Sequence, residues 1–553
     1  MAETGDMNSS SKWKLPVGVF FRDARSVFKW DLLGKEILGI AIPAALAVAA
    51  DPVASLIDTA FIGHIGPVEL AAAGVSIAIF NQASRITIFP LVSITTSFVA
   101  EEDTMANMKL KATQVENLED EKLDGMEKGS SKEDSKNLDK DSANAREMGM
   151  LKAEETKAEA KLGGEQSEET NEEEDKKDAT KGNEHKFPSV KSKTKKGRRH
   201  IASASTALIF GTILGLVQAI VLMFGAKTLL GVMGVKADSP MLAPAVKYLV
   251  TRSFGAPAVL LTLAMQGIFR GFKDTTTPLY VIVFGYSINI ALDPLLIFVL
   301  RMGIRGAAIA HVLSQYLMAL ILFLILVRKV DLMPPRLKDL QFGRFLKNGG
   351  FLLARVIAVT FCVTFAASLA ARLGATPMAA FQTCLQVWLT SSLLSDGLAV
   401  AVQTILACAF AEKDLKKATT SANRVLQMSF VLGVGLALLV GVGLYFGAGV
   451  FSRDVNVLHL IRIGLPFVAA TQPINSLSFV FDGVNFGASD FAYSAYSLIL
   501  VAIASIASLI FLSKSSGFVG IWTALTIYMA LRAFAGFWRM GTGTGPWRFL
   551  RNL

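Results

Sequence analysis

The chain has 553 residues, of which 52% are hydrophobic and 18% charged, with a mean hydropathy of +0.47 and a formal net charge of +10. This apolarity excludes a soluble globular protein of this length and indicates an integral membrane protein. The three cysteines, Cys362, Cys384 and Cys408, form no CxxC pair and no zinc-ligand spacing with histidine, so neither a disulfide framework nor a metal site is predicted. No nucleophile and base recur together, and no glycine loop would hold a phosphate. We therefore expect no enzyme, no cofactor and no nucleic-acid partner.

Residues 1–35 contain no apolar signal core and predict a cytosolic N-terminal tail. Beyond them, apolar windows of about 20 residues, each enough to cross ~30 Å of hydrocarbon, predict twelve transmembrane helices. The windows lie near residues 37–62, 71–100, 201–225, 241–265, 279–300, 306–327, 350–371, 379–410, 425–449, 458–480, 492–513 and 517–539.

A hydrophilic block at residues 101–200 separates the second and third predicted helices. It contains 26 acidic and 21 basic residues and almost no aromatic ones, which predicts a disordered loop with at most a fluctuating helix near 144–162. The block ends in the basic run KSKTKKGRRH. This run either binds anionic membrane lipids or merely fixes the topology.

The two halves of the chain repeat each other. GIRGAAIAHVLSQYLMAL from Gly303 recurs as GFVGIWTALTIYMALRAF from Gly517, an offset of 214, and GIFRG from Gly267 aligns with FVFDG from Phe479 at 212. Upstream the offset grows by about the length of the hydrophilic block. Duplicated hydrophobic units with a site between them are typical of secondary transporters.

The prediction is an all-α integral membrane fold with twelve transmembrane helices in two pseudo-symmetric six-helix lobes. The N-lobe (helices 1–6) covers 36–328, the linker 329–347, the C-lobe (helices 7–12) 348–540 and the C-terminal tail 541–553. Basic residues gather before the first helix and between the halves, so the positive-inside rule predicts that both termini, the linker and the block at 101–200 face the cytosol.

Four polar side chains of the first half are predicted to lie at one depth. Counting 1.5 Å per residue brings Asp58, Asn289, Asp293 and His311 to the same third of the membrane, with Asn289 and Asp293 on one helix face. Ionisable groups at this depth are costly unless they are paired or functional, so a proton or cation site is predicted, and a structural hydrogen-bond network is the alternative. Pro294 either loosens the helix beside Asp293 or makes a simple packing kink.

A second pair in this half is Asp51 and Arg85. Asp51 lies two helical turns before Asp58, and Arg85 lies near the middle of the second helix. An ion pair between them is a structural candidate, since pairing makes both groups tolerable in the membrane. If Arg85 is partly free, it instead faces the cavity and attracts an anionic substrate.

The second half offers groups of another kind. Arg355, Gln386, Gln472 and Asn475 are predicted to bind substrate, with Asp396 as the single acid expected at membrane depth. Guanidinium groups bind carboxylates bidentately, so this wall suits a small polyanion. The alternative for Arg355 is snorkelling toward the cytosolic interface.

Several stretches of the chain resemble the multidrug and toxic compound extrusion (MATE) family. They are LIDTAFIGHIG, GAPAVLLTLAMQGIFRGFKDTTTPL, NIALDPLLIF and GIRGAAIAHVLSQ, and TQPINSLSFVFDGVNFGASDFAYSAYS resembles the plant citrate exporters of that family. The resemblance implies two lobes in a V around a cavity, cation-coupled antiport, an acidic site at Asp58, and site residues at Asn289 and Asp293. Here His311 stands where many relatives carry a hydroxyl residue, and Asn475 where many carry an acid.

These observations together lead to one hypothesis and two alternatives. The hypothesis is a monomeric plasma-membrane antiporter that exports citrate, or a related organic anion, in exchange for protons. The first alternative is a proton-coupled exporter of phenolics or cationic drugs. The second is a membrane receptor or scaffold that acts through the charged block.

Overall fold

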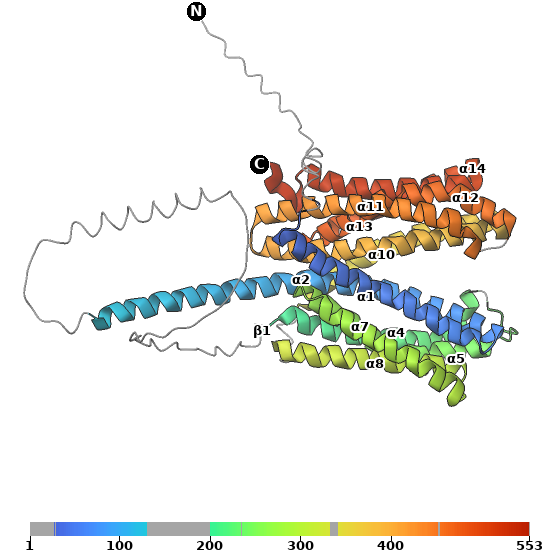
Figure 1. Ribbon diagram of the computed structural model, residues 1–553, viewed down its shortest axis with the longest axis horizontal. Coiled ribbons are helices and arrows are strands. Elements are labelled where there is room, and N and C mark those ends of the chain that lie inside the picture. Colours follow the sequence, from blue (N-terminus) through green and yellow to red (C-terminus); the bar gives the residue numbers. More distant parts are fainter. Residues whose placement is uncertain are drawn as a thin grey trace, which may run out of the picture. The chain divides into compact units, whose positions relative to one another are not determined.

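The structure is a computed structural model that describes residues 27, 29–129, 199–233, 235–331, 341–451 and 454–551. It contains two units, residues 1–109 with 198–553, and residues 110–197. In the second unit the described part is the continuation of one helix to Gly129. The first unit contains all the other described helices (Figure 1).

The N-lobe is formed by the helices between Leu32 and Lys329. They are α1 (Leu32–Gly63), α2 (Pro67–Gly129), α4 (Ala202–Val232), α5 (Leu242–Ser253), α6 (Ala256–Gly271), α7 (Thr276–Pro294), the π-helix η4 (Leu295–Val299) and α8 (Ile304–Lys329). Strand β1 (Arg199–His200) pairs in parallel with β2 (Val330–Asp331). We call the end of the helices where these strands pair the strand side (left in Figure 1), and the other end the opposite side.

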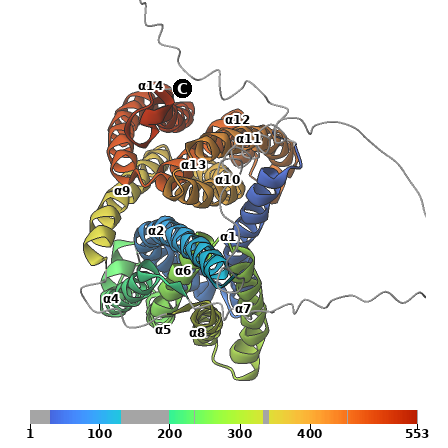
Figure 2. The ribbon, with the colours of Figure 1, turned by 90° about the vertical axis from the view of Figure 1, so that its left-hand side faces the viewer.

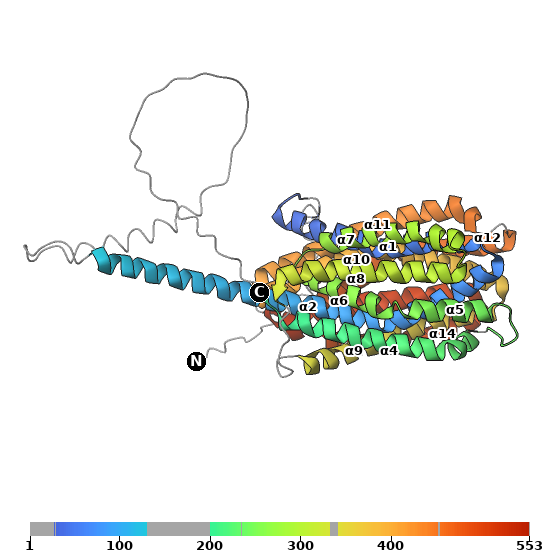
Figure 3. The ribbon, with the colours of Figure 1, turned by 90° about the horizontal axis from the view of Figure 1, so that it is seen from below.

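The C-lobe follows with helices of similar length. They are α9 (Phe342–Arg372), α10 (Ala375–Ala411), α11 (Leu415–Phe451), α12 (Val455–Ala470), α13 (Gln472–Gly487) and α14 (Phe491–Gly541), and the 3-10 helix η5 (Gly545–Arg551) comes last. Seen end-on, the blue-to-green helices and the yellow-to-red helices form two groups (Figure 2). Within both groups the helices run along a common direction (Figure 3).

Each of the twelve predicted spans is helical in the described residues. Eight helices are long and apolar enough to cross a membrane, and the pairs α5–α6 and α12–α13, bent by 45° and 48°, each add one more. α14 contains two of the predicted spans, separated at Gly517, where a φ of 55° interrupts the helix. The apolar part of α2 is the remaining span. The predicted all-α membrane fold is therefore confirmed.

Some predicted boundaries shift. α1 begins at Leu32, where Asp31 caps it by accepting a hydrogen bond from the backbone N–H of Gly34 (2.8 Å). α9 begins at Phe342, so the link between the lobes is shorter than 329–347. The C-terminal tail contains η5, which buries Trp547. Most of the predicted N-terminal tail lies outside the described residues.

The structure also corrects the register of the repeat. α6 and α13 are both 16 residues long, each starts with a proline in its first turn, Pro257 and Pro473, and their ends differ by 216 residues. The predicted offset of 212 is therefore wrong by four residues, about one helical turn. In the corrected register Gly267 corresponds to Gly483, and a Cβ on either would meet neighbouring backbone, at 3.1 and 2.3 Å.

Two further glycines mark the same repeat at the bent spans. A Cβ on Gly215 of α4 would lie 2.5 Å from Cα of Pro257, and one on Gly433 of α11 would lie 2.4 Å from Cα of Pro473. Each glycine therefore lets a neighbouring helix approach the start of a broken span.

The substitution Gly433→Ala is expected to destabilise the protein by about 1–3 kcal/mol, because the added methyl overlaps rigid backbone. Thermal unfolding of the purified protein in detergent measures the effect. Gly435→Ala, on the same helix with no atom within 4 Å of its Cβ, should leave the unfolding temperature unchanged or slightly higher. Equal behaviour of the two variants would contradict the packing argument.

The stretch predicted to be disordered begins as a helix. α2 continues without interruption through Glu101 to Gly129, whereas its counterpart α10 ends at Ala411, just before Lys413 takes a left-handed φ of 58°. The continuation is rich in Glu, Lys, Met, Leu and Ala, which favour helix without burial. Residues 130–198, with the predicted fluctuating helix and most of the basic run, lie outside the described residues.

The two lobes pack against each other on the strand side. The first half of α1 packs on α10 of the C-lobe. At this contact residue 397 must be glycine, because a Cβ there would lie 2.4 Å from the carbonyl oxygen of Ala41. α1 also packs on α7 of its own lobe, where Asp51 and Asp58 in its second half bind Tyr286 and Asn289. Phe345 at the start of α9 contacts Phe98 of α2 edge-on at 5.2 Å. Apolar contacts between the lobes therefore accumulate on this side.

Candidate functional site

The N-lobe buries a compact polar cluster on α1, α7 and α8, which we call the acid cluster: Asp58, Asn289, Asp293 and His311. Asn289 Nδ2 donates to Oδ1 of Asp58 (2.9 Å) and to Oδ2 of Asp293 (3.1 Å). His311 Nδ1 lies 3.5 Å from Oδ2 of Asp58. The structure thus brings together the four residues that the sequence places at one depth.

Two buried atoms of the acid cluster have no hydrogen-bond partner among the described residues. They are Oδ1 of Asp293 and Nδ1 of His311. A carboxylate oxygen and an imidazole nitrogen are both able to bind a proton. Oδ1 of Asp293 can therefore take up a proton without breaking an existing hydrogen bond, whereas an amide N–H of Gln315 directed at Nε2 of His311 leaves the proton of the neutral ring on Nδ1.

Three neighbours of the acid cluster are absent from the sequence prediction. Ser314 donates to Oδ1 of Asn289 (3.0 Å), and Gln315 Nε2 lies 3.3 Å from Nε2 of His311. Arg252 at the end of α5 is buried and interacts electrostatically with both carboxylates. Its guanidinium also donates to the Tyr248 hydroxyl (3.3 Å). Arg252 therefore gives the two acids a basic neighbour besides His311.

Asp51 has a hydrogen-bond partner that the sequence does not predict. Its Oδ1 accepts a hydrogen bond from the hydroxyl of Tyr286 on α7 (2.6 Å). The side chain of Arg85 lies outside the described part of the chain. The ion pair with Arg85, and a role of Arg85 in substrate binding, remain predictions.

The C-lobe buries a second charged group, which we call the arginine cluster. Arg355 of α9 and Arg532 of α14 both pair with Oδ2 of Asp482 on α13. All three are buried, and the guanidinium groups lie over the rings of Phe486 (5.1 Å) and Phe479 (4.8 Å). Arg355 therefore does not snorkel to an interface, and Asp396 is not the only acid at membrane depth in this lobe.

The predicted amide residues lie elsewhere in the C-lobe. Gln472 accepts from Ser391 Oγ (2.9 Å) and donates to the carbonyl of Val468 (3.0 Å). Asn475 is buried, and with its nitrogen toward Thr471 it donates to that carbonyl (3.2 Å). Both belong to a polar group at the bend between α12 and α13, while Gln386 is exposed on α10. The structure does not bring these three amides to Arg355.

The strand side is closed by polar contacts between the lobes. Gln403 of α10 donates to the carbonyl of Ser93 (2.7 Å) and to Ser97 Oγ (2.9 Å) on α2. Arg344 pairs with Glu101 (2.7 Å) and lies 3.9 Å above the ring of Phe98. These contacts hold the two lobes together on the strand side of the arginine cluster.

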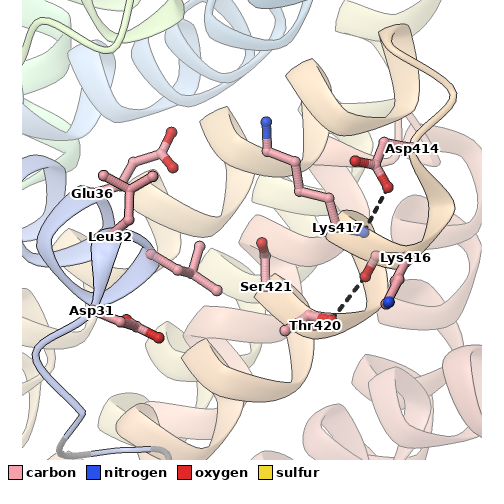
Figure 4. Close-up of a pocket in the computed structure, with 9 residues that line it drawn as sticks. Asp31, Leu32, Glu36, Asp414, Lys416, Lys417, Thr420 and Ser421 are labelled. Carbon is pink, nitrogen blue, oxygen red and sulfur yellow. Dashed lines mark hydrogen bonds between the residues drawn. The ribbon is translucent and has the colours of Figure 1, made fainter. Parts of the chain in front are cut away.

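A second contact on the strand side joins α1 to α11. Arg424 binds both carboxylate oxygens of Asp31 (2.6 and 2.7 Å). The backbone N–H of Gly34 and the guanidinium of Arg424 hold the pKa of Asp31 below its usual value. A cleft of about 460 Å³ opens beside this pair, with Leu32 and Glu36 on one wall and Lys417 on the other (Figure 4).

Comparison with known proteins identifies the family. The family model MatE matches residues 195–295 and 352–532, and Protein DETOXIFICATION 43 of Arabidopsis thaliana is 62% identical over 100% of this chain and 99% of its own length. The chain belongs to the MATE family. Protein DETOXIFICATION 42 of the same plant is 58% identical, covering 97% of both chains.

The fold comparison agrees with the family. A solved structure described as MATE in the bent conformation superposes with a TM-score of 0.69 at 17% identity, covering 94% of this chain and 96% of that one. At this identity the likeness concerns the fold alone. This MATE transporter therefore has the two-lobe, twelve-helix fold, with the acid cluster in one lobe and the arginine cluster in the other.

Proposed function

We propose that this MATE transporter is a proton-coupled antiporter that exports citrate from the cytosol across the plasma membrane. The observation that carries the proposal is the contrast between the lobes: two buried carboxylates share Asn289 in one, and two buried arginines share Asp482 in the other. A buried carboxylate with an unpartnered oxygen, as in Asp293, suits proton uptake, while guanidinium groups suit a multiply charged carboxylate.

The coupling step follows from the acid cluster. Asp58 belongs to α1, and Asp293 to the end of α7 where the helix becomes the π-helix η4. Protonation of either acid removes a charge that the N–H groups of Asn289 and the field of Arg252 stabilise. Because this changes the contacts between α1, α7 and α8, proton binding biases the arrangement of the lobe.

The membrane potential favours export of the proposed cargo. Moving one charge through 100 mV is worth about 2.3 kcal/mol, so three negative charges leaving a negative interior gain ~7 kcal/mol. The proton then serves mainly to reset the carrier. Export is therefore expected to be electrogenic.

The test is radiolabelled citrate flux in liposomes with an imposed pH step and the potential clamped at zero. One pH unit is worth about 1.4 kcal/mol per proton, so antiport should accumulate citrate on the acidic side about tenfold per exchanged proton. Asp293→Asn should abolish this accumulation, because its side chain cannot take up the proton. Asp238→Asn, an exposed acid between α4 and α5, is the matched control and should behave as native.

Two results would refute the proposal. One is flux that ignores both the pH step and an imposed potential. The other is citrate that fails to be carried while a cationic dye is, since the acid cluster by itself also suits a cationic drug. Leakage of neutral citric acid gives the opposite sign, because it accumulates citrate on the alkaline side.

A further inference from the structure

We propose that Arg270 of the N-lobe and the arginine cluster of the C-lobe together form the cargo site, a carboxylate-binding site shared by the two lobes, with Asp396 as the acid that weakens it. The proposal deepens the proposed function, since it names the residues that would hold an anionic cargo. The ligand class is a small di- or tricarboxylate.

The first observation that supports the proposal is that Arg270 is unpaired among the described residues. It lies partly buried in the last turn of α6 and has no hydrogen bond or ion pair to any described residue. Gln266, one turn earlier on the same face, is buried, and its amide also has no such partner. Arg252, Arg344 and Arg424 are all paired, so Arg270 is unusual. A guanidinium at the end of a membrane helix with no partner is well placed to receive an anion.

The depth of Arg270 can be followed along α1. Thr275, in the turn just after α6, donates to the carbonyl of Ile40 (3.0 Å). Gly397 of α10 packs against Ala41, the next residue of α1. Asp396 precedes Gly397, so it lies at about the depth of Arg270, and the two interact electrostatically without direct contact.

The arginine cluster lies at the same depth. A Cβ on Gly483, the residue after Asp482, would lie 2.3 Å from the carbonyl oxygen of Ala399, one helical turn beyond Asp396. Asp396 also interacts electrostatically with Arg355 and Arg532. It therefore lies between the free guanidinium of the N-lobe and the paired ones of the C-lobe.

The charges of this group favour an anion. Three arginines face two aspartates, Asp482 and Asp396, so the group carries one excess positive charge when all are ionised. Nε of Arg355 and Nε of Arg532 are buried and have no hydrogen-bond partner among the described residues. A carboxylate that reaches these N–H groups gains charge-assisted hydrogen bonds at no cost to an existing one.

The geometry also fits alternating access. Gln403, which closes the strand side against Ser93 and Ser97, follows Asp396 by seven residues, about 10 Å along α10. The proposed site therefore lies about three helical turns or less from the contact that closes the strand side, toward the opposite side. An anion held by arginines of both lobes binds best in one relative position of the lobes, and thereby shifts the population toward it.

The experiment measures equilibrium binding to the purified full-length protein in nanodiscs by titration calorimetry at fixed pH. The probes are citrate, malate, acetate and tetraethylammonium. Arg270→Gln should weaken citrate binding by roughly tenfold or more, because a charge-assisted contact is lost. The citrate affinity of Arg270→Lys should lie between those of native protein and Arg270→Gln. Asp396→Asn should strengthen citrate binding several-fold, because a like charge is removed.

Controls separate binding from folding and from the proposed function. Arg372→Gln, an exposed arginine at the other end of α9 from Arg355, should bind as native, and all variants should unfold at the native temperature. Citrate binding that is unchanged in both Arg270→Gln and Asp396→Asn overturns the site. If citrate does not bind but malate binding depends on Arg270, the proposed site is supported and the proposal of citrate export is refuted. If no anion binds in an Arg270-dependent way, the site is refuted even where pH-driven flux is observed.

Discussion

The substitution Asp482→Ala is expected to destabilise the C-lobe by about 3–5 kcal/mol. The carboxylate of Asp482 is 7% exposed and is shared by Arg355 and Arg532, which are equally buried. Removing it leaves two adjacent cations without a counter-charge in a low-dielectric interior. The measurements are thermal unfolding in detergent and the amount of folded protein in the membrane.

A compensating variant tests the physical reason. Replacing the three charges together by Asp482→Leu, Arg355→Met and Arg532→Met should restore most of the stability, since apolar groups of similar size often substitute for a buried ionic group. The same variant should not bind citrate. Asp238→Ala, at an exposed position, should have no effect. A triple variant as unstable as Asp482→Ala would show that packing, not charge, explains the loss.

The acid cluster is predictable because it needs only the regularity of helices. A rise of 1.5 Å per residue places Asp58, Asn289, Asp293 and His311 at one depth, and 3.6 residues per turn place Asn289 beside Asp293. The structure adds the contacts between α1, α7 and α8, which no spacing within one helix determines. Arg252 lies near the middle of the predicted span 241–265, so the cost of a charge in the membrane is sufficient to select it, but its proximity to the two acids depends on how the helices pack.

The arginine cluster is only partly predictable. Asp482 escapes prediction because it lies two residues beyond the predicted span 458–480, and the misaligned repeat sets it opposite Arg270 in the sequence alignment. The correct register can be read from the pairs Gly267/Gly271 and Gly483/Gly487, which have the same spacing. Each of these glycines allows a close approach of another helix. Arg532 lies deep in a predicted span, so the cost of a charge in the membrane is sufficient to select it. Which of these charges meet depends on tertiary packing.

The helix that continues α2 escapes prediction for a different reason. Low hydrophobicity and many charges argue against a packed core, but they do not argue against a helix that extends an existing one. After the apolar part of α2 has formed, each added residue costs no new nucleation. The residues up to Gly129 therefore continue as helix where composition alone predicts disorder.

The substitution Arg424→Gln is expected to shift the transporter toward states open on the strand side. Arg424 is buried and joins α11 to the start of α1 through both oxygens of Asp31 and through the carbonyl of Lys29. A glutamine is too short and too weak a donor to replace these contacts. Because this pair ties the start of α1 to α11 where α1 packs on the C-lobe, its loss is expected to favour separation of the lobes on this side.

Spin labels at Met108 of α2 and Leu415 of α11, both exposed near the strand side, report the separation by pulsed electron resonance. Arg424→Gln should add a population at longer distance that native protein lacks. Lys417→Gln breaks the exposed pair with Glu412 on the wall of the same cleft and should leave the distances unchanged. Identical distributions in all three proteins would exclude a closing role for Arg424.

The same pair determines how this closure responds to pH. Gly34 and Arg424 lower the pKa of Asp31, so the contact contributes fully above the ordinary aspartate value of about 4 and is lost only as pH falls through the lowered pKa. The increase in open population that Arg424→Gln causes, relative to native protein at the same pH, should therefore be the same at pH 5.5 and 7.5. Any acid-induced opening of the native protein in that range must come from other groups, for which the acid cluster is the candidate. Opening that depends on pH in native protein but not in Asp293→Asn would assign the sensor to Asp293.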